Sequence, residues 1–136
     1  MDSDIIDNAE DRISFYPKWS ILLFSALGSV LFGAILMAIN INKTENKKNT
    51  PSTIFFALIF IAVCAKLVTL LKISVIYSVF GQNIIGGLIL IFPIWKHNLG
   101  AHSNYQPKPI WIPLIILISS ITALILLNLF AVNNYR

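Results

Sequence analysis

Long stretches of the chain carry no charge, and their lengths constrain the fold more than any other feature of the sequence. Residues 19–39 form an uncharged run of 21, residues 53–95 form a run of 43 interrupted only by Lys66 and Lys72, and residues 110–132 form an uncharged run of 23. With a rise of about 1.5 Å per residue, roughly 20 helical residues cross a hydrocarbon core about 30 Å thick. The run lengths therefore predict transmembrane helices.

Too few charged side chains are present to cover a water-soluble domain. Hydrophobic residues make up 57% of the chain, charged residues make up 12%, and the mean hydropathy is +0.78. In soluble domains roughly a quarter of the residues are charged. We therefore expect an all-α integral membrane protein that contacts the lipid bilayer directly.

Four helices account for the apolar runs. The run of 43 residues is twice as long as one span, so we expect the chain to turn back near Lys72. The predicted fold is a four-helix transmembrane bundle over residues 19–136, with helices at about 19–39, 53–71, 73–95 and 110–132, after a polar, acidic tail over residues 1–18. A cleavable signal peptide is the competing interpretation of the first run, but its leader would be basic and its apolar core shorter.

The three tryptophans fall at the ends of the expected helices. Trp19 opens the first helix, Trp95 closes the third and Trp111 opens the fourth. Tryptophan is enriched where a membrane meets water, because its ring is largely apolar and its N–H needs a partner. We interpret these residues as interfacial anchors.

The distribution of basic residues leaves the orientation in the membrane open. If both termini and the turn near Lys72 share one side, that side holds Arg12, Lys18, Lys66, Lys72 and Arg136, and the other holds Lys43, Lys47, Lys48, Lys96 and Lys108. With a count of five against five the positive-inside rule favours neither orientation, and a dual-topology protein would show the same balance. The acidic tail slightly favours a cytoplasmic position for the two basic loops.

Small residues in the first and third expected helices suggest close helix packing. Ser25, Ser29 and Gly33 are spaced by four residues, and Gly86 and Gly87 are adjacent. Small side chains let two helix backbones approach each other, which is a main source of helix association in lipid. We expect these residues to pack inside the bundle, with a homodimer seam as the alternative.

Three polar side chains lie at membrane depth. Gln82 and Asn83 need hydrogen-bond partners there because water is absent. They predict a polar point in a permeation pathway, an interhelical contact, or a longer loop between two helices. Lys66 is the only charged side chain inside an expected span, and its long stem can carry the ammonium group to the interface near Lys72.

The sequence offers no residue set for catalysis or metal binding. Between residues 19 and 132 the only carboxylate is Glu45, which lies in an expected loop. His97 and His102 have no Cys, Asp or Glu in their loop, and Cys64 is the only cysteine. We therefore expect no metal, no cofactor and no enzymatic activity. The scattered lysines form no basic stripe and predict no nucleic-acid partner.

The order of features along the chain also follows a pattern. An aromatic pair (Phe15, Tyr16) precedes a helix rich in small residues that ends at Asn40. A hairpin then closes on Ile94, Trp95 and Lys96, and Gly100 and Tyr105 precede the last helix. This order resembles that of small four-helix proteins of the bacterial inner membrane. The resemblance implies the same location and assigns no functional residue.

An interaction or accessory role is the function that we expect. A subunit of a larger membrane complex, or an immunity-type protein, acts through lateral helix faces and needs no catalytic residues. The alternative is a small homo-oligomeric channel or transporter in which Gln82 and Asn83 of two copies face one pathway. Small multidrug exporters have this size and helix number, but they rely on a glutamate in the first helix, which is absent here.

Overall fold

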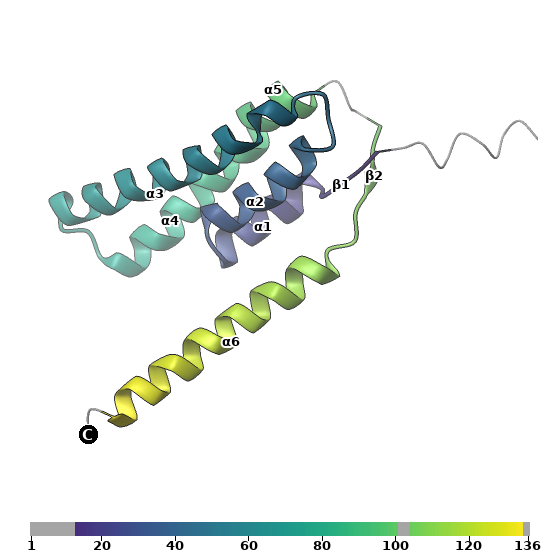
Figure 1. The fold of residues 1–136 in the computed structure, drawn as a ribbon. Helices are drawn as coiled ribbons and strands as arrows, with labels where there is room; N and C mark the ends of the chain where they lie inside the picture. Colours follow the sequence, from purple (N-terminus) through teal and green to yellow (C-terminus); the bar gives the residue numbers. More distant parts are fainter. Residues whose placement is uncertain (1–12, 101–103, 135–136) are drawn as a thin grey trace, which may run out of the picture.

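The computed structural model describes residues 13–100 and 104–134, which fold almost entirely into helices (Figure 1). In chain order the elements are β1 (Ser14–Phe15), α1 (Lys18–Leu27), α2 (Val30–Ile41), the 3-10 turn η1 (Lys47–Asn49), α3 (Thr50–Leu71), α4 (Val75–Ile89), the π-helical segment η2 (Leu90–Ile94), α5 (Trp95–Leu99), β2 (Gln106–Pro107) and α6 (Trp111–Asn134). The prediction of an all-α fold is confirmed. Three helical stretches, Lys47–Leu71, Val75–Leu99 and Trp111–Val132, are long and apolar enough to cross a membrane.

The expected helix over residues 19–39 is instead a hairpin of two short helices. α1 has 10 residues and α2 has 12, so their lengths are about 15 Å and 18 Å, roughly half of a hydrocarbon core about 30 Å thick. The two helices pack side by side, and β1 and the loop after α2 lie at the same end of the molecule (Figure 1). The prediction of a single span here, and hence of four spans, was wrong.

The chain reverses at Gly28 and Ser29. Ser29 is extended (φ −179°, ψ 163°), and its hydroxyl oxygen accepts a hydrogen bond of 3.2 Å from the N–H of Phe32, so it caps α2. The N–H of Gly28 donates to the carbonyl of Phe24 at 2.9 Å and closes the last turn of α1. Backbone groups at the reversal are thereby satisfied within the chain.

α3 and α4 form a longer hairpin beside the first. α3 ends at Leu71, Lys72 adopts a left-handed conformation (φ 51°), and α4 begins at Val75. A left-handed residue after the last helical turn is a common way to end a helix. The chain therefore turns at Lys72, at the end of the molecule away from β1 (Figure 1).

α4, η2 and α5 are continuous and reach Leu99, beyond the expected end at Trp95. Pro93 lies inside this helix and has no N–H to donate. The helix widens around it, and the N–H of Trp95 reaches the carbonyl of Leu90, five residues earlier. The π-helical turn lets the helix continue past proline.

Two short strands connect the start of the described chain to α6. β1 and β2 pair in parallel: the N–H of Gln106 donates to the carbonyl of Ile13 at 3.2 Å, and the N–H of Lys108 donates to the carbonyl of Phe15 at 2.8 Å. We call this pair the strap, and the end of the molecule that carries it the strap end. From there α6 first packs against the short hairpin, where Leu117 is buried near Gly28, and then continues obliquely past it with exposed side chains (Figure 1).

The hydrophobic core surrounds the short hairpin and includes a residue from the expected polar tail. Phe15 is fully buried, and its ring centroid lies 6.4 Å from that of Trp95 and 5.6 Å from that of Tyr105. Other fully buried side chains include Ile21, Phe24, Met37 and Leu90. The last residues of segment 1–18 therefore belong to the folded core, whereas residues 1–12 lie outside the described residues.

Candidate functional site

Three glycines allow α4 and the two arms of the short hairpin to touch. A Cβ atom on Gly33 would overlap Ser25 Oγ on the other arm, and one on Gly86 would overlap the side chain of Val30. A Cβ atom on Gly87 would lie 2.9 Å from Ser25 Cβ. Ser25 and Gly33, expected along one face of a straight helix, instead face each other across the hairpin.

Asn83 lies against the tip of the hairpin. Its side chain is buried, and its Oδ1 accepts a long hydrogen bond of 3.4 Å from the N–H of Val30. Val30 is the first residue of α2, so its N–H has no partner within that helix. The amide takes the place of water at this position and connects α4 to the hairpin.

Gln82 and Lys66 lie apart from Asn83. Gln82 is half-buried and lines an apolar groove of about 450 Å³ between α3 and α4, beside Cys64 and Tyr77. Lys66 is exposed and lies near the end of α3 where the chain turns at Lys72. The structure therefore does not gather the three polar residues into one pathway.

Asn40, near the end of α2, connects that helix to the segment before α1. Its side chain is fully buried, its Oδ1 accepts a hydrogen bond of 2.8 Å from the N–H of Tyr16, and its Nδ2 donates to the carbonyl of Tyr16 at 2.9 Å. One amide thus pairs with both backbone groups of a residue in the extended segment before α1. Sequence reasoning missed this role, although an amide that ends a long apolar run was the available signal.

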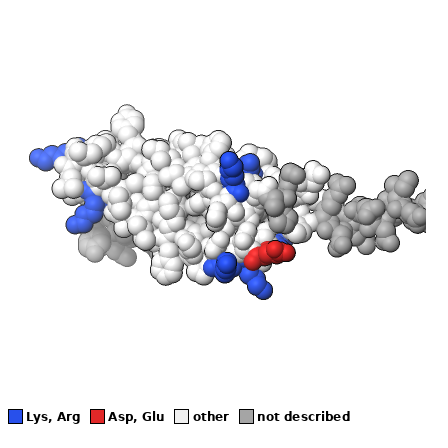
Figure 2. All heavy atoms as spheres, turned by 90° about the horizontal axis from the view of Figure 1, so that it is seen from above, with Lys and Arg blue, Asp and Glu red and all other residues white. Residues whose placement is uncertain are grey.

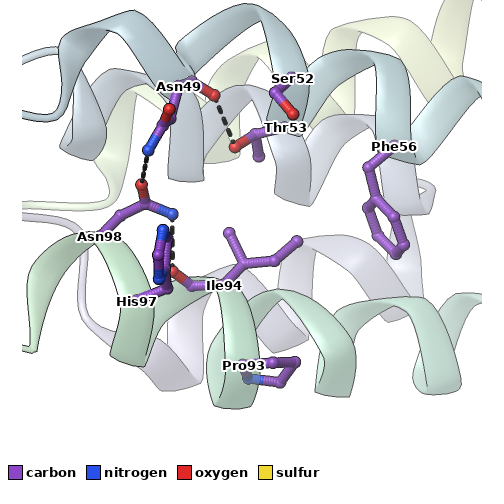
Figure 3. Close-up of a pocket in the computed structure, with 8 residues that line it drawn as sticks. All are labelled: Asn49, Ser52, Thr53, Phe56, Pro93, Ile94, His97 and Asn98. Carbon is purple, nitrogen blue, oxygen red and sulfur yellow. Dashed lines mark hydrogen bonds between the residues drawn. The ribbon is translucent and has the colours of Figure 1, made fainter.

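A cavity of about 400 Å³ lies at the strap end between α3 and the helix formed by η2 and α5 (Figure 3). The amide of Asn49 donates to Asn98 Oδ1 at 2.8 Å, and the amide of Asn98 donates to the carbonyl of Ile94 at 2.9 Å. The amide of Asn46 donates to the carbonyl of Asn98 at 3.0 Å. These polar groups are directed at one another, so they connect the two helices. His97 lines the cavity without any carboxylate or cysteine among the lining residues.

A second cavity, of about 510 Å³, lies between the start of α1 and α5. Lys18 and Lys96 line it together with Trp95, Leu99 and Tyr105. Lys18 Nζ lies 5.4 Å from the centroid of the Trp95 ring, a distance at which a cation is attracted to the ring face. Among the described residues no carboxylate lines this cavity, and its described lining combines positive charge with aromatic and aliphatic walls.

Lysines gather at the strap end because the short hairpin returns there. Figure 2 shows basic side chains at the two ends of the molecule, with uncharged side chains between them. Among the described residues, the strap end carries Lys18, Lys43, Lys47, Lys48, Lys96 and Lys108, and the other end carries Lys66 and Lys72. The equal numbers of basic residues expected on the two sides for a straight first helix are therefore replaced by an excess of lysines at the strap end.

Lys43 shows the effect of this crowding. Its Nζ donates to the carbonyl of Ser14 at 2.7 Å and to the hydroxyl of Ser14 at 3.1 Å. Partial burial, and then the positive charge of Lys108, lower the pKa of Lys43 below its usual value. Lys43 and Lys108 therefore repel each other at the strap end.

The three tryptophans occupy two kinds of environment. Trp19 and Trp111 are exposed, at 57% and 70% of their surface, near the start of α1 and of α6. Trp95 is only 4% exposed and packs edge-on against Phe15. The structure thus leaves two of the expected anchors on the surface and places the third in the core.

α6 carries a continuous exposed face that sequence reasoning missed. Every side chain from residue 118 to residue 132 is exposed. Residues spaced alternately by three and four positions share one helix face, and this face of α6, which we call the α6 stripe, comprises Ile118, Ile121, Ile125, Asn128 and Val132. The amide nitrogen of Asn128 donates to the carbonyl of Leu124 at 3.0 Å, whereas its Oδ1 has no hydrogen-bond partner among the described residues.

The described part of the chain contains no group of three His, Cys, Asp or Glu side chains that could hold a metal ion, and His102 lies outside it. The chain matches no known family model, no curated protein and no solved structure.

Proposed function

We propose that the protein is a small integral membrane protein with an interaction or accessory role, exerted through α6. In this role α6 packs against a transmembrane helix of another membrane protein, as in a subunit of a membrane complex or an immunity-type protein. The observation that carries the proposal is the α6 stripe, in which every residue is exposed and one carries an amide. The proposal assigns no catalytic role.

Apolar exposure alone needs no partner in a bilayer, so the argument rests on Asn128. The residue lies 17 positions after Trp111, which places it about 25 Å along the helix and still within a core about 30 Å thick. An amide oxygen without a hydrogen bond is unfavourable in hydrocarbon, and interhelical hydrogen bonds are one way to supply the partner. Asn128 is therefore a point of attraction on an otherwise apolar face.

The spacing of the stripe fits a helical partner. Contacts that alternate by three and four residues are the pattern of left-handed helix packing, the commonest arrangement of membrane helices. A single asparagine in such a pattern fixes the register of two helices. The partner that this face fits is a helix with an amide or hydroxyl side chain at the matching depth.

Substitution of Asn128 tests the proposal. The full chain is purified from its native membrane in a mild detergent, and we expect a partner in fixed stoichiometry. Asn128→Leu should weaken that association about five- to thirty-fold, the effect of losing about 1–2 kcal/mol for one interhelical amide contact. The matched control is Ser120→Ala, which also removes a polar group from α6 but lies off the stripe.

Two results would contradict the proposal. One is recovery of the chain without any partner, with its native genomic neighbours present. The other is an association that Asn128→Leu and Ser120→Ala leave equally strong. A complex that contains only copies of this chain would instead favour the homo-oligomeric alternative.

We also propose that the strap end faces the cytoplasm of a bacterial inner membrane. Cytoplasmic loops of membrane proteins carry an excess of lysine and arginine. The six lysines of the strap end against Lys66 and Lys72 supply this asymmetry among the described residues. Residue 13, where the described chain begins, is then on the cytoplasmic side.

A small homo-oligomeric channel or transporter is the second candidate, and the short hairpin favours it. Helices that end midway across the membrane are typical of channels and transporters, where their termini face the transported species. Flux of halides, cations or lipophilic amines into vesicles containing the purified protein, altered by Gln82→Ala, is the expected result. Absence of flux for all three classes would remove this candidate.

A further inference from the structure

The cavity between α1 and α5 differs from the one beside Asn49 in whether its polar groups are already paired with other protein groups. The Asn49 and Asn98 side chains hydrogen-bond to each other, so that cavity offers few free donors. The Lys18–Lys96 cavity instead carries two ammonium groups for which no ion pair is found among the described residues. Glu45, the one carboxylate in the described ranges, is not among the residues that line it.

Part of the wall of the Lys18–Lys96 cavity is apolar. Phe92 is 66% exposed and lies about one helical turn before Lys96, and the buried Leu99 also lines the cavity. Ile91 and Phe92 belong to the π-helical segment η2. Cations therefore adjoin exposed apolar surface at the level where the apolar helix ends, which matches a molecule with an anionic head and a hydrocarbon tail.

We propose that the Lys18–Lys96 cavity binds an anionic phospholipid. The two ammonium groups hold the phosphate, and the acyl chains lie along Phe92 toward the bilayer. The indole ring of Trp95, whose centroid lies 5.4 Å from Lys18 Nζ, helps to hold that ammonium group in place. Basic pockets between membrane helices on the cytoplasmic side bind anionic headgroups by the same physics, and this inference rests on the orientation proposed above for the strap end.

The test compares two pairs of lysines at the same end of the molecule. The full chain in mild detergent is titrated with phosphatidylglycerol or phosphatidylcholine, and bound lipid is counted by native mass spectrometry. The variants are Lys18→Gln with Lys96→Gln, and the matched control Lys47→Gln with Lys48→Gln, which removes equal charge from η1, outside the cavity.

We expect the unmodified chain to prefer phosphatidylglycerol over phosphatidylcholine. The cavity pair should weaken phosphatidylglycerol binding about ten- to thirty-fold, as expected for two lysines near a headgroup, and the control pair about two-fold or less. Replacing both cavity lysines by arginine should retain the preference, which separates lost charge from lost folding.

Three results would overturn the proposal. They are equal binding of the two lipids, equal losses for the two lysine pairs, and displacement of phosphatidylglycerol by millimolar inorganic phosphate, which would indicate a site for a soluble anion. The proposal stands independently of the role of α6. Asn128→Leu should leave lipid binding unchanged even where it abolishes association with a protein partner.

Discussion

The contact between Ser25 and Gly33 distinguishes the short hairpin from a straight transmembrane helix. In the hairpin, a Cβ atom on Gly33 would overlap Ser25 Oγ and lie 3.0 Å from the carbonyl oxygen of Ile21. In a straight helix the two residues would be eight positions apart, about 12 Å along the axis, and would not touch. The change in stability caused by a substitution at position 33 should therefore depend on the residue at position 25 only if the hairpin forms.

We expect Gly33→Ala to destabilise the protein by about 2–3 kcal/mol. Overpacking of a tight contact typically costs about 1–3 kcal/mol, and the upper part of this range applies because the backbone carbonyl of Ile21 cannot rotate away. Ser25→Ala removes the overlapping hydroxyl, so the double variant should recover about 1–2 kcal/mol of this loss. The part of the loss that is not recovered comes from two other close contacts of the added methyl group, with Ser25 Cβ at 3.1 Å and with the carbonyl oxygen of Ile21.

The assay is reversible unfolding in mixed micelles, followed by circular dichroism as the denaturing detergent fraction rises. The control is Gly81→Ala, because a Cβ atom there meets no atom within 4 Å. This control should be neutral or stabilising by up to about 1 kcal/mol, from helix propensity alone. A coupling energy between positions 25 and 33 below about 0.5 kcal/mol would refute the hairpin, since distant sites are additive to that degree.

Three further predictions test the arrangement around the hairpin. The first uses single cysteines in a chain whose natural cysteine is replaced by alanine. Lys18→Cys and Asn42→Cys should react with a membrane-impermeant thiol reagent from one side of the membrane, and Lys72→Cys should react from the other side. Reaction of Lys18→Cys and Asn42→Cys from opposite sides would indicate a spanning helix. Asn40→Ala leaves two backbone groups unpaired and should cost about 2–5 kcal/mol in the micelle assay, whereas Asn42→Ala, at an exposed position, should cost about 0.5 kcal/mol or less. Phe15→Ala should cost about 3–5 kcal/mol because its ring is fully buried, and a loss below about 1 kcal/mol would show that the segment before α1 is not part of the core.

The lengths of the apolar runs predicted the long helices, because a helix that crosses the bilayer needs about 20 apolar residues. The α3–α4 turn at Lys72 follows from the same reasoning, since a run of 43 residues is too long for one span. Run length did not reveal the break at Gly28 and Ser29. Two residues lower the mean hydropathy of a run very little, yet one of them reverses the chain because its hydroxyl caps the next helix.

Single amides were also hard to interpret from the sequence. Asn40, Asn83, Asn98 and Asn128 occur in or beside apolar runs, and the sequence does not say which backbone group each one meets. Asn40 and Asn83 bond to residues 24 and 53 positions away, so their roles depend on how the helices pack. Trp95 illustrates the same limit, since its place at a helix end predicted an exposed anchor and the ring of Phe15 covers it instead.

The strap gives the molecule a mechanical connection between its first described residues and its last helix. Because the strands run in parallel, tension on residue 13 loads the bonds from Gln106 and Lys108 together in shear, rather than opening them one after the other. Lys108 is three residues before Trp111, so the displacement reaches the base of α6 through a short connector. A load on residue 13 is therefore transmitted through two hydrogen bonds to the connector that leads into α6.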